Sequence, residues 1–238
     1  MSAQSAAVRT AMRVTRQSVA TRGRILTAVA LAAIILLLAI AIRIQDGSQE
    51  ALVGVLINAG LVFQVPVVTL VFATSAFGDF TEDQTLVYLW LRPLPRWHLA
   101  VAVTCASLVV TIPLTAGPLV VAALIGGAAE FAIPVLVASA LGSAAYGSLF
   151  VALGLRAKRA LTWGLIYVLI WEGILGGVSA SFARVSLRRY VVSAFTETAG
   201  VGWEGHTTSA GHAFAVLTVI VLVGVGLCTW FLHSREIE

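Results

Sequence analysis

The sequence predicts an all-α polytopic membrane protein with a single transmembrane domain, residues 1–238. Hydrophobic residues make up 59% of the 238 residues, charged residues make up only 11%, and the mean hydropathy is +0.98. A soluble domain carries about 25% charged and about 45–50% apolar residues, so this composition argues against a water-soluble enzyme and against a disordered chain. The long runs are apolar on every side, whereas membrane β-strands alternate polar and apolar residues, so the runs predict helices.

Six segments are long and apolar enough to cross a bilayer. The hydrocarbon core is about 30 Å thick and a helix rises about 1.5 Å per residue, so a span needs about 20 mostly apolar residues. The predicted spans are residues 25–42, 52–76, 99–125, 131–155, 160–182 and 213–233. The second and third uncharged runs exceed the bilayer thickness, so we expect those helices to tilt or to extend beyond it.

The basic residues predict the orientation of these spans. With the N-terminus inside, eleven Lys and Arg residues fall in cytoplasmic segments and four fall outside. Because cytoplasmic loops carry the excess of basic residues, both termini are expected to be cytoplasmic. The net charge of +4 therefore reflects topology and membrane lipids, and the sequence has no Lys/Arg stripe or RNA-binding aromatic motif that would indicate nucleic acid. All basic residues except Lys158 are Arg, a bias typical of GC-rich bacterial genomes, which favours the bacterial cytoplasmic membrane.

Residues 5–22 are predicted to form an amphipathic helix on the inner membrane surface. Four side chains recur at helical spacing on one face, and they are Val8, Met12, Thr15 and Val19. Three arginines lie about 100° around the helix, where they can reach lipid phosphates. The alternative is a basic tail that only sets the topology.

A second amphipathic segment, residues 78–96, lies between the second and third spans. Thr81 and Gln84 have the spacing of a capping box, the acidic side chains of its first turn suit a helix N-terminus, and Pro93 ends the helix. The short helix is rich in apolar side chains, which are Leu86, Tyr88, Leu89, Trp90 and Leu91. Such a surface expects a partner protein, although it could also rest on the membrane or on neighbouring helices.

Polar side chains inside the spans are few. Glu172 lies in the fifth span, and a carboxylate there should face protein or water because its burial in lipid costs about 2.5–3.5 kcal/mol. It is a structural acceptor, a lining residue of a substrate path, or a proton-coupling site. Asn58 and Gln64 of the second span either hold helices together or line a path, and Pro66 is expected to kink that span. The external segment 184–211 predicts short helices at the outer interface.

Searches for catalytic motifs identify no active site in the chain. The sequence has no Walker A pattern, no H-E-x-x-H and no C-x-x-C, so we expect neither ATP hydrolysis nor a catalytic or metal site in this chain. Glu204, His206 and His212 have only a generic spacing for metal binding. We therefore expect no cofactor on this chain.

The pattern across the chain resembles the membrane permeases of ABC transporters, of the type-2 exporter family. The motifs that carry the resemblance are Gly78-Asp79, Glu82-Asp83, Thr85-Leu86, Leu89, Leu91-Arg92-Pro93 and Arg96, then Tyr167 to Glu172, and Ser186 with Arg189-Tyr190. The resemblance implies six spans, an elbow helix at residues 5–22, and a coupling helix in residues 78–96 that docks on a separate ABC ATP-binding subunit.

By the same resemblance, ATP and Mg would be bound by that ATPase subunit, and a second permease would complete the transporter as a homodimer or heterodimer. The residues that would couple to the ATPase are Asp79, Glu82, Asp83, Thr85, Leu86, Leu89, Arg92, Pro93 and Arg96. The candidate path or interface residues are Asn58, Gln64 and Glu172. The substrate would be drug-like, a lipid or a peptide, moved outward. Two alternatives are a stand-alone proton-coupled carrier or channel centred on Glu172, and a membrane assembly factor without transport activity.

Overall fold

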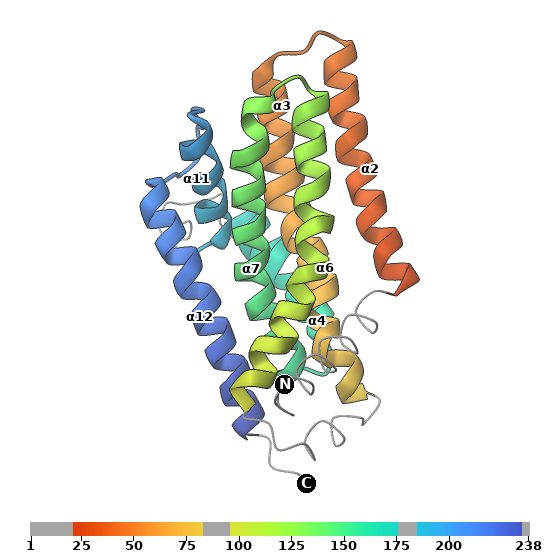
Figure 1. Cartoon of the computed structure of the whole chain (residues 1–238), viewed down its shortest axis with the longest axis vertical. Coiled ribbons are helices and arrows are strands. Elements are labelled where there is room, and N and C mark those ends of the chain that lie inside the picture. Colours follow the sequence, from red (N-terminus) through yellow and green to blue (C-terminus); the bar gives the residue numbers. More distant parts are fainter. Residues whose placement is uncertain (1–20, 83–95, 176–184, 235–238) are drawn as a thin grey trace, which may run out of the picture.

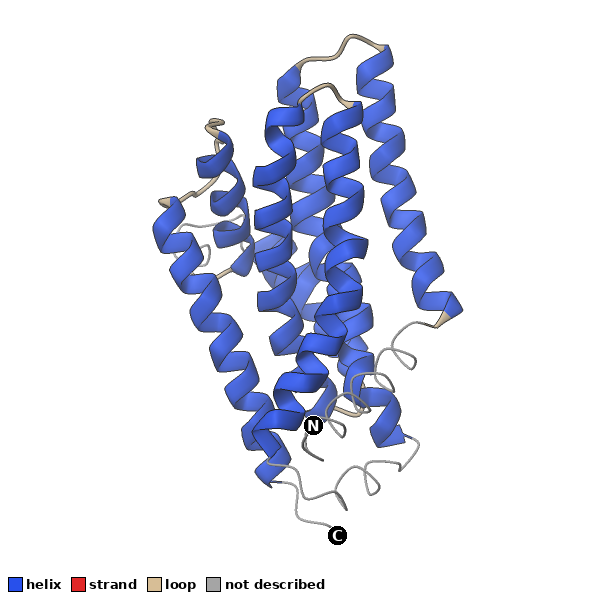
Figure 2. Cartoon of the chain, viewed as in Figure 1, coloured by secondary structure: helices blue, strands red, loops and turns tan. Residues whose placement is uncertain are grey.

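The computed structural model describes residues 21–82, 96–175 and 185–234, and the side chains of residues 77–82, 96 and 174–175 are outside the described set. Every regular element in the described part of the chain is helical (Figure 2). The elements in chain order are α2 (Arg22–Ile44), α3 (Gln49–Val55), η1 (Leu56–Gln64), α4 (Val65–Glu82), α6 (Arg96–Ile125), η2 (Ala129–Phe131), α7 (Ala132–Arg156), α8 (Ala160–Ile166), η3 (Tyr167–Leu175), α11 (Leu187–Ala199) and α12 (Ala210–Ser234).

Within this described part, 5 helices are long and apolar enough to cross a membrane. They are Arg22–Ile44, Gln49–Ala76, Trp97–Ile125, Ala129–Arg156 and Ala210–Ser234. They coincide with the predicted first, second, third, fourth and sixth spans, so the prediction of a helical membrane protein is confirmed. The predicted fifth span is described only as far as residue 175, where α8 and η3 include a shorter apolar helix, Ala160–Gly173. The count of six stays a prediction.

Helix α7 stands at the centre of the bundle, between α4, α6, α11 and α12 (Figure 1). It has 15 buried residues, many of them Gly, Ala or Ser. Small residues let helices approach closely, and a Cβ atom on Gly154 would meet the carbonyl oxygen of Thr74 in α4. By contrast α2, at the edge of the bundle, buries only Ala28, Ile35 and Ala39.

The outward faces of the peripheral helices are apolar. Leu26 and Leu37 of α2, Leu222 and Trp230 of α12, and Trp163 of α8 are each at least half exposed. Soluble monomers rarely expose continuous apolar patches above a few hundred Å². These faces are suited to lipid, which agrees with the span assignment.

Two of the predicted cytoplasmic features are outside the described part of the chain. The elbow helix, residues 5–22, is described only from residue 21. Of the coupling segment, the backbone is described through Glu82, where α4 ends, and again from Arg96, where α6 begins. The side chains of all its predicted contact residues are outside the described set. Both helix ends lie at the same end of the bundle as the first residue of α2 and the last of α12 (Figure 1).

Candidate functional site

The Glu172 carboxylate is buried in η3, with 1% of the residue exposed, and it accepts four hydrogen bonds. The Tyr167 hydroxyl donates from the same segment at 2.7 Å. The Ser186 hydroxyl and the backbone N–H groups of Leu187 and Arg188 donate from the start of α11, the latter two at 2.9 Å and 3.0 Å. Four donors satisfy most of the acceptor capacity of a carboxylate, so the burial of this charge is compensated.

Glu172 therefore caps α11 from another part of the chain. The first N–H groups of a helix have no partner within the helix, and the helix dipole makes this end positive. Ser186 occupies the N-cap position but makes no side-chain bond to its own helix, because its hydroxyl donates to Glu172. The buried Tyr146 of α7 also lies close enough to interact with this carboxylate. Of the three sequence-based interpretations of Glu172, this geometry fits the structural acceptor.

The cap explains the position of α11. The sequence predicted short helices at the outer interface in segment 184–211, and the described part of that segment has one helix, α11, whose first turn is fixed to a side chain within the fifth apolar segment. From that point α11 runs alongside α7 and α12 (Figure 1), and Val191, Ala194 and Phe195 are fully buried. The helix is consequently part of the packed bundle. The tertiary contact with Glu172 has no signature in the local sequence.

Gln64 is fully buried at the end of η1, and it donates to a backbone carbonyl of the neighbouring helix α6 that lacks its usual helical donor. Its Nε2 donates to the carbonyl oxygen of Leu114 in α6 at 3.3 Å. That carbonyl would normally receive the N–H of residue 118, which is a proline and has none. The Oε1 atom of Gln64 has no hydrogen-bond partner among the described residues. Gln64 thus links two spans while leaving one buried acceptor unsatisfied.

Asn58 differs from both of these residues. It is exposed on η1, and its Nδ2 donates to the carbonyl of Gly54 in the preceding turn, at 3.0 Å. It therefore forms no hydrogen bond with another described helix. The three candidate residues share no hydrogen-bond partner. Glu172 is bonded to Tyr167 and to the start of α11, whereas Gln64 is bonded to α6.

In the described part of the chain, the buried Gln64 and Glu172 both lie in π-helical segments. In η1 the N–H of Val65 bonds to the carbonyl of Gly60, five residues earlier, directly before Pro66. The wider π turn lies where the sequence predicted a kink. In η3 the π-helical region carries Glu172 itself. Segments of this kind are frequent at functional sites, and here they present polar side chains to neighbouring helices.

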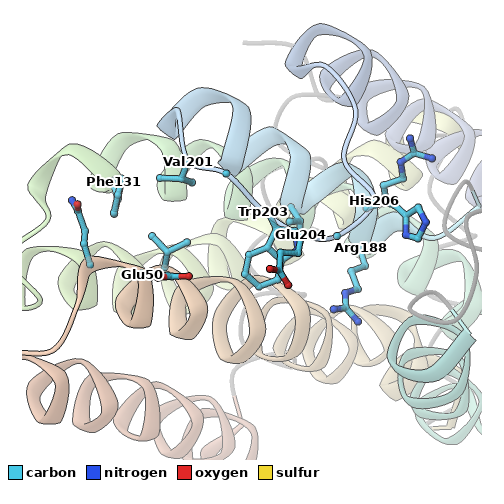
Figure 3. Close-up of a pocket in the computed structure, with 13 residues that line it drawn as sticks. Glu50, Phe131, Arg188, Val201, Trp203, Glu204 and His206 are labelled. Atoms are coloured by element: carbon cyan, nitrogen blue, oxygen red, sulfur yellow. The ribbon is translucent and has the colours of Figure 1, made fainter.

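A cleft of about 680 Å³ opens beside α11 (Figure 3). Helix α11 lies toward the end of the bundle remote from the start of α2 and the end of α12 (Figure 1). The charged or polar residues that line the cleft are Gln49, Glu50, Arg188, Arg189, Glu204 and His206. Val53, Phe131, Val192, Val201 and Trp203 form its apolar walls. The sequence indicated the basic and aromatic character of segment 184–211, but it gave no signal that Glu50 of the second span would face that segment.

The loop that covers the cleft is fastened to α11. The Arg189 side chain donates from Nη2 to the carbonyl of Thr207 at 3.0 Å. The N–H of Thr208 donates to the Ser193 hydroxyl at 2.9 Å. On the opposite wall, Gln49 donates to the Glu130 carboxylate and so joins the two neighbouring turns. In the described part of the chain, no three His, Cys, Asp or Glu residues group together as a metal site.

The fold and these sites define the class as a helical membrane protein. No family model matches the chain, and no curated protein matches it significantly. The assignment to this class therefore depends on the structure alone.

Proposed function

We propose that the chain is the membrane-spanning permease subunit of an ATP-driven ABC exporter. The resemblance of residues 78–96 to a coupling helix carries the proposal. It is supported by the topology, because α4 and α6 both reach the same end of the bundle at Glu82 and Arg96. Helix α7 also ends there, at Arg156, followed by exposed Lys158 and Arg159. Coupling residues on this segment would act directly on two long helices.

Packing supports a route for such a movement. Helices α4 and α6 both contact α7, and α7 in turn contacts α11 and α12. At Gly154 the backbones of α7 and α4 are so close that a side chain would overlap Thr74. Closure of an attached ATPase that moves α4 would therefore move α7 as well. A second permease would supply the other wall of the substrate path, and exposed Asn58 is a candidate contact with it.

The proposed reaction is outward movement of a drug-like, lipid or peptide substrate. ATP and Mg would be bound and ATP hydrolysed on the separate subunit, because this sequence lacks the P-loop lysine pattern. The alternative carrier centred on Glu172 gains no support from the geometry. Its carboxylate holds four donors in place, whereas a proton-coupling group must exchange its proton with a path.

The test begins with purification of the tagged chain from its native membrane in mild detergent. We expect a P-loop ATPase to be retained and Mg-dependent ATP hydrolysis to be measurable in the complex. Reversal of charge at Glu82 and Asp83 to Lys should remove the stimulation of hydrolysis by transport substrate, with expression unchanged. Glu197→Lys, which reverses an exposed acid of α11, is the matched control. A chain that never retains an ATPase, or a reversal without effect, contradicts the proposal.

A further inference from the structure

The cleft beside α11 arranges opposite charges at different positions along its length. Arg188 lies in the first turn of α11, next to the Glu172 cap, and its side chain extends into the cleft (Figure 3). Val201 and Glu50 lie toward the other end of the cleft, where α11 ends and α3 begins. Glu204 lies between them, beside Trp203. The guanidinium is thus nearer the middle of the bundle, and the carboxylates are nearer its end.

These charged groups do not neutralise one another. Among the described residues, the side chains of Arg188, Glu50 and Glu204 form no hydrogen bond or ion pair with each other or with other residues, and Arg189 has a buried Nε without a partner. Arg188 is half-buried, whereas Glu50 and Glu204 are exposed, so solvent alone satisfies these charges until a ligand takes its place. A ligand with both a negative and a positive group would satisfy both sets at once.

We propose that this cleft binds the headgroup of a zwitterionic phospholipid with a phosphate and a primary ammonium. The planar guanidinium of Arg188 binds phosphate oxygens with charge-assisted hydrogen bonds. The ammonium donates to the Glu50 and Glu204 carboxylates and lies near the Trp203 ring. In such a lipid the phosphate is attached to the apolar part and the ammonium is outermost. The cleft has the same order, with Arg188 toward the bundle middle and the carboxylates toward its end.

The size and walls of the cleft fit this ligand. Small-molecule sites range over about 300–1,000 Å³, and this cleft holds about 680 Å³. Its walls at Val53, Phe131 and Val192 are apolar and can contact the glycerol and the first acyl carbons. Membrane lipids surround a helical bundle of this type, so the ligand is present at high local concentration. This inference does not depend on an ATPase partner or on transport.

The experiment uses the full purified chain, incubated with an equimolar mixture of phosphatidylethanolamine, phosphatidylcholine and phosphatidylglycerol with identical acyl chains. Native mass spectrometry then counts the lipids retained. We expect phosphatidylethanolamine to be retained at least about threefold over the other two, because only it combines phosphate with an ammonium that donates hydrogen bonds. Arg188→Gln should reduce its retention about tenfold, and Arg188→Lys should restore part of it.

The carboxylates determine the selectivity. The double variant Glu50→Gln with Glu204→Gln should retain phosphatidylglycerol as well as phosphatidylethanolamine, because the repulsion of the anionic lipid is removed. Arg159→Gln, at an exposed position in the turn between α7 and α8, should change nothing. Unchanged melting temperatures of the variants show that folding is not the cause. Equal retention of the three lipids by the natural chain, preference for phosphatidylglycerol, or no effect of Arg188→Gln overturns the proposal.

The phosphate and the ammonium could come from a membrane lipid or from the free headgroup compound. Competition with soluble glycerophosphoethanolamine distinguishes these two ligands. Competition by the soluble compound shows that the headgroup alone is recognised, as the charges in the cleft predict. If millimolar amounts of the soluble compound fail to displace the lipid, the acyl chains dominate binding. The headgroup would then not be the determinant, and the proposal would be wrong.

Discussion

Glu172 in η3 and Gln64 in η1 are both fully buried in π-helical segments of the bundle, yet their contacts differ in kind. Glu172 accepts four hydrogen bonds and fixes the start of α11. Gln64 donates one bond to a carbonyl released by Pro118 and leaves its own oxygen without a described partner. A buried hydrogen-bond network stabilises the fold when every donor and acceptor has a partner, and it contributes little when one of them has none. The first site should therefore govern stability and the second should tolerate change.

The largest effect is expected for Glu172→Ala. The substitution leaves two backbone N–H groups and two hydroxyls without their acceptor, and it removes the negative charge from the positive end of α11. Unsatisfied buried donors and a lost cap together should lower the free energy of unfolding by about 3 kcal/mol. Thermal unfolding in detergent measures the change. Glu197→Ala, an exposed acid on the same helix, is the control, and equal melting temperatures of the two variants would contradict the capping role.

Glu172→Gln separates charge from hydrogen bonding. The amide keeps one acceptor oxygen but places an NH₂ group among four donors, so some bonds are lost while the shape is kept. We expect a loss of about 1–2 kcal/mol, between the natural chain and Glu172→Ala. Protection of α11 amides from hydrogen exchange should fall in the same order. An amide variant as stable as the natural chain would show that the charge contributes nothing at the helix terminus.

Gln64→Leu should have a smaller effect than either change at Glu172. It removes one hydrogen bond but also removes the unsatisfied oxygen, and the two contributions partly cancel, so the change should stay within about 1 kcal/mol. Pro118→Ala supplies the missing backbone N–H to the Leu114 carbonyl. In that background Gln64→Leu should cost less than it does alone. Additive effects of the two substitutions would show that Gln64 does not compensate for the proline.

Asn58→Leu is expected to have the smallest effect on the isolated chain. The Asn58 side chain bonds only within its own helix and is exposed, so the free energy of unfolding should change by less than about 0.5 kcal/mol. Any larger consequence should be seen in the association of two copies, measured by cross-linking in membranes. A large loss of stability without a change in association would show that Asn58 stabilises the single chain and does not contact a second copy.

The sequence predicted features that are determined within one segment, and it did not predict contacts between segments that lie far apart in the chain. Apolar length identified the five long spans because the bilayer thickness acts on each segment separately. Glu172 and Gln64 were recognisable as polar groups in apolar spans, which must find partners. Their actual partners, at Ser186 and Leu114, depend on tertiary packing, as does the position of Glu50 opposite Arg188. Pro118 was the one local signal for the Leu114 contact, since it removes a helix donor.

We propose that residues 78–96 receive the movement of a nucleotide-hydrolysing partner. Photo-cross-linking in intact membranes tests this coupling, with a photoreactive residue at Leu89 and a control at Asp46. We expect that Leu89 is linked to a P-loop ATPase, that the yield of this product changes when ATP is bound, and that Asp46 gives no such product. Labelling of position 89 by a membrane-impermeant reagent from outside the cell, without any ATPase product, would contradict it.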